Sequence, residues 1–278
     1  MGLNFPTSLL LGHVIQATGL RGADVYCLGY PTCKIDQKKL ARLAATLGLD
    51  AGPLKGKAKL TTPEVVRFLG GGNVRGIDIS AHEGADIVMD LSRDTVPPEL
   101  QGVARLILDN GTLEHVAHVP NALKVIHDLL AVGGVVVHSN PSNGYIDHGF
   151  FQFSPTFYND WHRENAYEVI TASFSRYFPD SDSNDIRPYA GDLFRSQPFS
   201  AMMRDYGFGN ILFAARKTAE STCDRQPVQS VYRKRYTGQD YGHEQRAPLT
   251  YSHRAPLAPT LLRRALPPAV KRTIKKFL

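Results

Sequence analysis

The chain has 278 residues, enough for one large α/β domain with an appendage and a substantial buried core. Its three cysteines, Cys27, Cys33 and Cys223, lack metal-type spacing and are too few for a disulfide framework, which favours a reducing compartment. No apolar run approaches the roughly 20 residues of a membrane span and no signal peptide is recognisable, so we expect a cytoplasmic protein.

The net charge of +6 is distributed unevenly along the chain. Residues 217–278 contain 13 Lys and Arg against 4 Asp and Glu, whereas residues 1–216 contain 19 against 22. The basic character therefore belongs to the C-terminal end. We predict one domain over residues 1–216, followed by a basic C-terminal extension over 217–278 that is partly disordered or an amphipathic helix.

The first part of the domain alternates helix and strand patterns. Three stretches with helical patterning are each followed by glycine: 5–18, 38–47 and 63–69. Three short apolar runs predict buried strands: 25–28, 74–79 and 85–89. Only residues 80–84 separate the last two of these strands, which leaves no room for a crossover helix.

The stretch 104–141 contains a complete strand–loop–helix–strand unit. Residues 105–108 are a short apolar run that ends in a turn sequence, and helical spacing of apolar residues begins near Pro120. We expect Gly133-Gly134 to end the helix, because a β-branched run follows at once. Two parallel strands joined by a helix are the repeating unit of an open α/β sheet.

Residues 167–174 and 209–215 predict two late strands, which we expect to pair as an antiparallel hairpin at the sheet edge. Residues 178–199 between them are rich in Asp, Ser and Pro and predict a long loop. Seven aromatic residues after residue 141 are too dense for a solvated loop. We interpret them as a lid over a ligand site or as the wall of that site on its substrate side; the alternative is a satellite core under a long loop. The seven residues are Tyr145, Phe150, Phe151, Phe153, Phe157, Tyr158 and Trp161.

The sequence LILDNGTLEHV, followed by a helix and by GGVVVHSNP, resembles the second half of the class I S-adenosylmethionine-dependent methyltransferase domain. The resemblance is to a methyltransferase type 11/12-like domain and extends more weakly over most of the chain before residue 216. It implies an α/β fold: a Rossmann-like, doubly wound, mostly parallel seven-stranded sheet with an antiparallel edge hairpin. It also implies a methyltransferase whose cofactor is S-adenosyl-L-methionine.

The resemblance assigns cofactor-binding residues at the carboxyl ends of the strands, where open α/β sheets bind ligands. Gly29 matches the first glycine of the family's glycine-rich loop, where the backbone approaches the methionine part. Asp78 matches the acidic residue that accepts hydrogen bonds from the ribose hydroxyls, and Asp90 matches the polar residue that meets the adenine amino group. Asp109 and Asn110 are expected beside the methyl group and the substrate.

The glycine-rich loop departs from the family's pattern. Cys27 stands where an acidic residue is usual, and Tyr30-Pro31 begins a segment that replaces the later glycines. A methyltransferase-like scaffold that has lost cofactor binding is therefore an alternative reading. A nucleic-acid-binding protein that uses its basic extension is a second alternative, although no recognisable nucleic-acid-binding module is present.

We rank Glu114, His115 and His148 first as catalytic residues, because a hydroxyl or amine acceptor must lose a proton during in-line methyl transfer. Glu-His resembles the pair that, with an earlier Glu and a later His, binds a divalent metal in small-RNA 2′-O-methyltransferases and ubiquinone-pathway O-methyltransferases. Gly111 stands in place of that earlier Glu, so we assign no metal to the site. Three readings stay open: a facial metal site of one carboxylate and two imidazoles, with Asp109 as a substitute ligand; His148 as a general base without metal; and a structural role in which the Glu fixes the loop and the His packs.

Residues 256–278 contain no acidic residue and mix aliphatic with basic side chains. Such a segment suits the surface of an anionic membrane. We therefore predict a cytoplasmic methyltransferase that acts on a hydroxyl or similar group of a small molecule, a saccharide or a lipid-linked intermediate. The extension would contact the membrane peripherally, and we do not expect nucleic acid as a partner.

Overall fold

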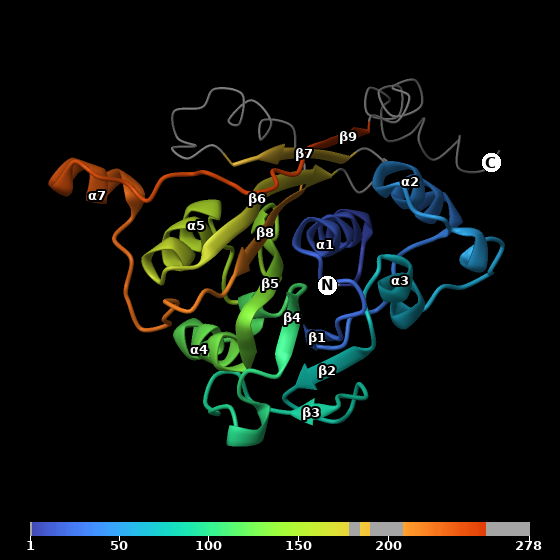
Figure 1. Ribbon diagram of the computed structural model, residues 1–278, viewed down its shortest axis with the longest axis horizontal. Coiled ribbons are helices and arrows are strands. Elements are labelled where there is room, and N and C mark those ends of the chain that lie inside the picture. The colour runs from blue at the N-terminus through green and yellow to red at the C-terminus, as the bar shows by residue number, and fades with distance from the viewer. Residues whose placement is uncertain (1, 178–183, 190–207, 254–278) are drawn as a thin grey trace, which may run out of the picture.

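The structure, a computed structural model, describes residues 2–177, 184–189 and 208–253 (Figure 1). A twisted sheet of nine strands runs through it. One half of the sheet is parallel and has the spatial order β3 (Ile87–Val88), β2 (Val74–Asp78), β1 (Val25–Leu28), β4 (Ala104–Asp109) and β5 (Leu130–Asn143). The other half is antiparallel and continues from β5 with β8 (Phe208–Arg216), β6 (Glu168–Tyr177), β7 (Asn184–Pro188) and β9 (Tyr251–His253). The α/β class and the parallel central strands predicted from the sequence are confirmed.

The prediction of seven strands is wrong, because β7 and β9 extend the antiparallel half. β7 lies inside the stretch predicted as a long loop. Its sequence has low strand propensity, but backbone pairing with β6 and complete burial of Ile186 outweigh that preference. The two strands predicted over 167–174 and 209–215 do pair antiparallel, as β6 and β8, but they lie inside the sheet because four strands form its antiparallel side.

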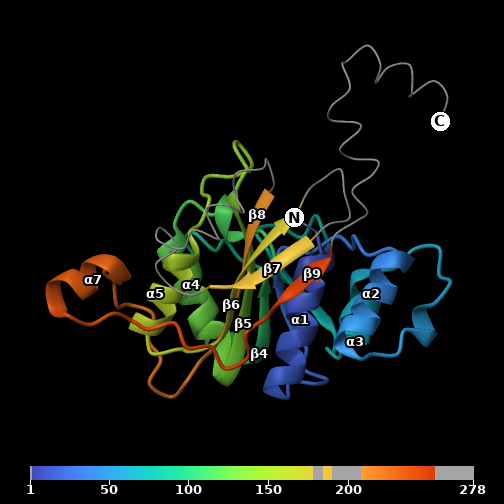
Figure 2. The same cartoon turned by 90° about the horizontal axis from the view of Figure 1, so that it is seen from above.

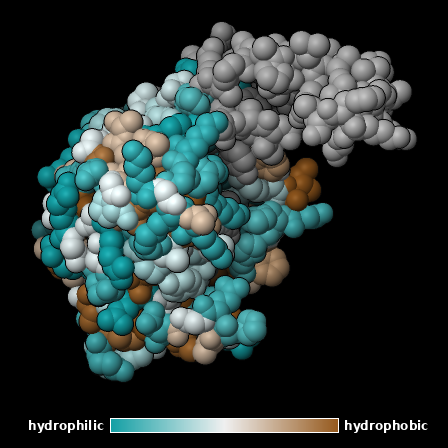
Figure 3. Space-filling view, turned by 90° about the vertical axis from the view of Figure 1, so that its right-hand side faces the viewer, coloured by the Kyte–Doolittle hydropathy of each residue, from teal (hydrophilic) through white to brown (hydrophobic). Residues whose placement is uncertain are grey.

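Helices cover both faces of the sheet (Figures 1 and 2). The first face carries α1 (Phe5–Thr18), α2 (Gln37–Leu47) and α3 (Thr62–Phe68), and the second carries α4 (Val119–Leu129) and α5 (Pro155–Glu164). Neighbouring residues of one strand face opposite sides, so that Leu106 and Leu108 join the first core while Ile107 joins the second. The outer surface over α2 and α3 is mostly hydrophilic (Figure 3). This is the doubly wound arrangement predicted from the sequence.

Local hydrogen bonds explain where the helices begin and end. The Asn4 side chain accepts a hydrogen bond from the Thr7 amide at 3.0 Å, and Gly19 ends α1 in the left-handed conformation at φ 70°. α4 ends at Leu129, before the predicted Gly-Gly stop. The ammonium of Lys217 donates to the carbonyl oxygens of His127 and Leu130 at 2.7 and 2.9 Å, which satisfies carbonyl groups at the end of this helix.

The helix α5 was not predicted, although Ser154 and Pro155 are typical of a helix start. The Ser154 hydroxyl accepts from the Thr156 amide at 3.2 Å. Tyr158 and Trp161 on this helix are buried in the second core, so they form neither an exposed aromatic wall nor a satellite core under a loop. By contrast, two aromatic residues that precede the helix, Phe150 and Phe151, are exposed.

Three short 3₁₀ turns connect these elements: η1 (Gly52–Leu54), η2 (Pro98–Leu100) and η3 (Leu113–His115). No described helix has the length and apolar character needed to cross a membrane. The thiols of all three cysteines are free.

The C-terminal extension returns to the sheet over its described part, residues 217–253. After the exposed helix α7 (Ser230–Thr237), Gln245 accepts a hydrogen bond from the Ala172 amide at 2.8 Å and donates one to the Tyr189 carbonyl at 2.8 Å. Leu249 is buried in the first core, and β9 pairs with β7. The amphipathic stretch 256–278, for which we expect membrane contact, lies outside the described residues.

Candidate functional site

A cavity of about 480 Å³ opens at the carboxyl ends of β1, β2, β3 and β4. Open α/β sheets bind ligands at this edge, and small-molecule sites usually measure roughly 300–1,000 Å³. Four of the five residues predicted to bind the cofactor line the cavity: Gly29, Asp78, Asp90 and Asn110. Residues that are distant in the sequence thus meet where the sheet topology brings the strand ends together.

Gly29 forms part of the cavity floor directly after β1. Its backbone has φ 69°, in the left-handed region, and its amide donates to the Ile77 carbonyl at 2.7 Å. A Cβ at this position would lie 3.3 Å from Thr112 Oγ1 and 3.9 Å from Asp78 Oδ2. The Thr112 hydroxyl in turn donates to the Leu28 carbonyl. Both the backbone conformation and the close neighbours therefore favour glycine here.

The two cavity-lining aspartates differ in how many partners their carboxylates have. Asp90 Oδ1 accepts from the Ser92 amide at 2.8 Å, and Oδ2 lies 3.3 Å from Arg93 Nε. Asp78 Oδ1 accepts only a 3.4 Å contact from the Ser80 amide, and Oδ2 has no hydrogen-bond partner among the described residues. Asp78 therefore has the greater free capacity to accept hydrogen bonds from a ligand.

Tyr30 and Pro31, which replace the usual glycines, line the wall of the cavity without closing it. The Tyr30 ring packs beside Gly76 of β2, where an added Cβ would come within 3.0 Å of the ring. The missing side chain at position 76 therefore makes room for Tyr30. A glycine inside a strand often marks such a close approach, so Gly76 was a recognisable clue in the sequence.

Asp109 lies outside the cavity lining, which corrects its predicted place beside the methyl group. Its side chain is fully buried, with Oδ1 accepting from the Thr112 amide at 3.1 Å and the Leu113 amide at 3.3 Å. Oδ2 lies 2.8 Å from Nδ1 of His138, which is also buried. With these partners the Asp109 carboxylate stabilises the loop that follows β4. It is not available to a ligand in the cavity, whereas the neighbouring Asn110 is.

Asn110, the next residue, does reach the lining although it is largely buried. Its side-chain oxygen accepts from the Thr7 hydroxyl at 3.2 Å, whereas Nδ2 has no partner among the described residues. A buried amide donor without a partner is costly, and a ligand oxygen would remove that cost.

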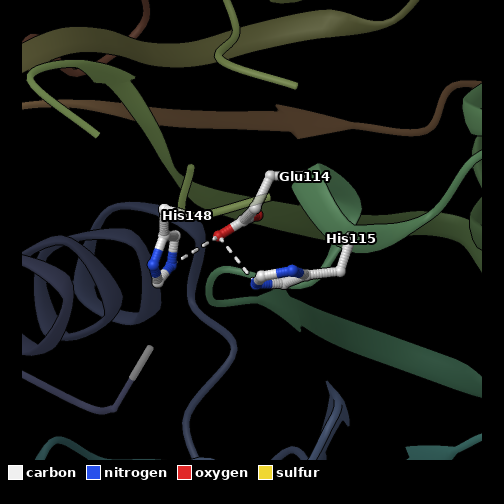
Figure 4. Close-up of side chains that lie close together, drawn as sticks. All are labelled: Glu114, His115 and His148. Carbon is white, nitrogen blue, oxygen red and sulfur yellow. Dashed lines mark ion pairs between the residues drawn. The ribbon is translucent and has the colours of Figure 1, made fainter. Parts of the chain in front are cut away.

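Glu114, His115 and His148, the predicted catalytic residues, form one cluster beside the cavity (Figure 4). Glu114 is fully buried, and Nδ2 of Asn140 donates to its Oε2 at 3.1 Å. Its Oε1 has no hydrogen-bond partner in the described part of the chain and lies 3.9 Å from His115 Nε2 and 3.8 Å from His148 Nε2. His115 also lines the cavity, so the cluster communicates with it.

Burial determines the protonation of this cluster. Burial, with a smaller effect of the Asp109 charge, raises the pKa of Glu114 to about 7. Burial also lowers the pKa of His115, with a further contribution from His148, and it lowers the pKa of His148. At neutral pH both imidazoles are therefore largely uncharged and have lone pairs for a proton or a cation.

No family model matches the chain. No curated protein matches it either. Among solved structures, a putative sarcosine dimethylglycine methyltransferase from Galdieria sulphuraria is 15% identical over 76% of this chain and 84% of its own, with a TM-score of 0.44. The MccD protein is 13% identical over 77% and 98%, with a TM-score of 0.43. A TehB-like SAM-dependent methyltransferase from Corynebacterium glutamicum is 16% identical over 75% and 88%, with a TM-score of 0.39. We therefore infer function from the cavity and its surrounding groups.

Several cavity-lining residues were not identified from the sequence. Met89, Leu91 and Ser92 surround Asp90 in the chain, and Glu83 lies in the short β2–β3 connection. Their position at or just after the end of a predicted strand was the available clue, because the carboxyl ends of parallel strands share one edge. Apolar walls with a few polar groups are typical of small-molecule sites.

Proposed function

We propose that the chain is an S-adenosyl-L-methionine-dependent methyltransferase that acts on a hydroxyl or a similar nucleophile. The observation that carries the proposal is the cavity at the carboxyl edge, with Gly29 in its floor, the open carboxylate of Asp78 in its wall and His115 at its border. The Glu114 cluster then lies on the side where a methyl acceptor would enter.

The residues present fit this cofactor. Asp78 accepts hydrogen bonds only, and its free Oδ2 suits a ribose diol. The absence of a side chain at Gly29 allows a ligand to approach the backbone, and Met89 and Leu91 offer apolar contact to an adenine ring. When bound, the cofactor supplies an electrophilic methyl group on a sulfonium.

The chain's own groups must position the acceptor and receive or release its proton. In-line displacement needs the acceptor atom aligned with the methyl group at about 3–3.5 Å, which a shaped cavity can enforce. Within the described residues, the cluster of Glu114, His115 and His148 combines basic nitrogens with direct access to the cavity. We therefore assign acceptor activation to this cluster.

The acceptor class is proposed from the surroundings of the cluster. The backbone amides of Phe150 and Phe151 both donate to the Glu114 carbonyl, and both side chains are exposed beside it. Aromatic faces of this kind suit sugars and apolar rings. We propose a small molecule, a saccharide or a lipid-linked intermediate, which the basic stretch 256–278 would bring close to an anionic membrane.

Isothermal titration calorimetry of the full chain with S-adenosylmethionine and S-adenosylhomocysteine tests the proposal. We expect binding of both, followed by transfer of a labelled methyl group to members of a hydroxylated acceptor panel. If neither ligand binds at millimolar concentration, the chain is a methyltransferase-like scaffold and the enzyme assignment is wrong.

A further inference from the structure

We infer that Glu114, His115 and His148 bind a divalent first-row transition metal ion. Their ligand atoms, one carboxylate oxygen and two imidazole Nε2 atoms, all lie within 4.8 Å of one another. In Figure 4 both imidazole rings are directed at the same carboxylate oxygen, from two separate segments of the chain. Two imidazoles and one carboxylate in a facial arrangement are a recurrent set of metal ligands.

The unpartnered oxygen of Glu114 is the second, independent observation. The side chain is fully buried, yet Oε1 has no hydrogen-bond partner among the described residues. Burying a carboxylate oxygen without a partner is costly, and buried charges are normally paired or coordinate a metal. A cation between Oε1 and the two Nε2 atoms would remove this cost.

The distances suit an ion after a small adjustment. Oε1 lies 3.9 Å from His115 Nε2 and 3.8 Å from His148 Nε2. Ligand atoms about 2.1 Å from a metal at tetrahedral angles lie about 3.4 Å apart, so the carboxylate oxygen must approach each imidazole by about half an ångström. The ligand nitrogens of the two histidines, which lie within 4.8 Å of each other, must approach by at most about 1.4 Å. Side chains at partly exposed positions can make such a shift, and those of His115 and His148 are 47% and 37% exposed.

Surrounding groups hold the carboxylate in place. Nδ2 of Asn140 donates to Glu114 Oε2 at 3.1 Å, and the Tyr158 hydroxyl donates to Asn140 Oδ1 at 2.8 Å. This chain of hydrogen bonds occupies the far oxygen and leaves Oε1 facing the imidazoles. Outer partners of this kind orient metal ligands in known sites.

The loop that carries His148 is fixed to the same residue. The amide of Phe150 donates to the Glu114 carbonyl at 2.7 Å. At Gly149 a Cβ would lie 2.7 Å from that carbonyl oxygen, so a side chain there would push the loop away. Glycine at this position therefore allows His148 to approach Glu114.

The donor set indicates the class of ion. Mg²⁺ and Ca²⁺ prefer oxygen ligands, whereas imidazole nitrogen suits Mn²⁺, Fe²⁺, Co²⁺ and Zn²⁺. Three protein ligands leave coordination positions open, as in catalytic metal sites. Because His115 lines the cavity, these positions are accessible from it; that an acceptor oxygen occupies one of them rests on the proposed function.

A second group of potential ligands, His127, Asp128 and Cys223, provides a matched control. There, the Tyr167 hydroxyl lies 2.7 Å from His127 Nδ1, and Lys124 forms a 2.5 Å ion pair with Asp128. These groups already have partners and a nearby cation. We expect no ion at this second group.

The test uses the full chain, stripped of metal with a chelator, and titrates Mn²⁺, Co²⁺ or Zn²⁺ by calorimetry, with Co²⁺ absorption as a spectroscopic readout. We expect one ion per chain in the wild type. Glu114→Gln and His148→Gln should each weaken binding by about 100-fold or more, whereas His127→Gln should bind as the wild type does. Circular dichroism verifies that each variant is folded. Because His148 is partly exposed, His148→Gln is the variant that disturbs the fold least.

Failure of the wild type to bind any of these ions would overturn the site, as would binding that survives both Glu114→Gln and His148→Gln. A parallel titration of the metal-free protein with S-adenosylhomocysteine separates this inference from the proposed function. Cofactor binding without metal binding would refute the metal site and leave the proposed function standing. Metal binding without cofactor binding leaves the site intact and removes the methyltransferase assignment.

Discussion

Replacing Asp78 with Asn tests the cofactor site most directly. The substitution keeps the size of the side chain but removes its charge and gives one end a donor in place of an acceptor. Hydrogen bonds to a charged group contribute about 1.5–3 kcal/mol each, so loss of one bond and weakening of the other should cost roughly 2–4 kcal/mol. We therefore expect the Kd for S-adenosylhomocysteine to rise by roughly 30- to 1,000-fold, measured by calorimetry.

Stability should change little in this variant, because the only contact of the Asp78 carboxylate within the described residues is the 3.4 Å one from the Ser80 amide. Asp24→Asn is a matched control at the opposite edge of the sheet. Asp24 accepts from the Asn73 amide at 2.8 Å, so its replacement should lower stability without changing cofactor affinity. Wild-type affinity in Asp78→Asn, or an equal loss in Asp24→Asn, would refute the assignment of Asp78 to the ribose.

Three further predictions concern the supports of the site. Gly29→Ala should destabilise the protein by about 1–2 kcal/mol, because the φ of 69° at this position is unfavourable for alanine. It should also weaken cofactor binding. Thermal unfolding measures the loss of stability and calorimetry measures the loss of affinity; an unchanged melting temperature would contradict the prediction. Burial, and secondarily His138, holds the pKa of His162 well below its usual value, so the wild type should lose up to about 1.4 kcal/mol of stability per pH unit below 6.5 as the unfolded chain takes up a proton. The free energy of unfolding, measured with denaturant between pH 7 and 5, should depend less steeply on pH in His162→Gln than in the wild type. An equal pH dependence in the two proteins would count against a buried, uncharged His162. Tyr158→Phe leaves the Asn140 oxygen without its 2.8 Å donor and should cost about 1–3 kcal/mol in thermal unfolding, a loss that a purely apolar role for the ring would not produce.

The parallel half of the fold could be predicted because local patterns specify it. The helix over residues 5–18 has its cap and its terminal glycine in the sequence, and the apolar runs that form β1 and β4 are bounded by turn residues. By contrast, β7 forms by pairing with the preceding strand β6, and β9 forms by pairing with β7, which is distant from it in the sequence. Because their own residues favour a loop, no local pattern could have predicted them.

Some features of the candidate site could likewise be predicted from the sequence, whereas others depend on tertiary contacts. The order of strands predicts which edge Gly29 and Asp78 share, since parallel strands place their carboxyl ends together. The burial of Asp109 was not predictable, because it depends on His138 from the neighbouring strand β5. The approach of His148 to Glu114 depends on a loop whose path follows from backbone hydrogen bonds.

The position of β9 matters for anyone who wishes to study the domain without its basic end. Cutting the chain after residue 216 would delete Leu249 from the first core and leave the outer side of β7 with unpaired amide and carbonyl groups. Exposed strands of this kind recruit other chains, so the shortened protein should self-associate. A cut after His253 keeps that edge covered and still removes seven of the 13 basic residues that follow β8.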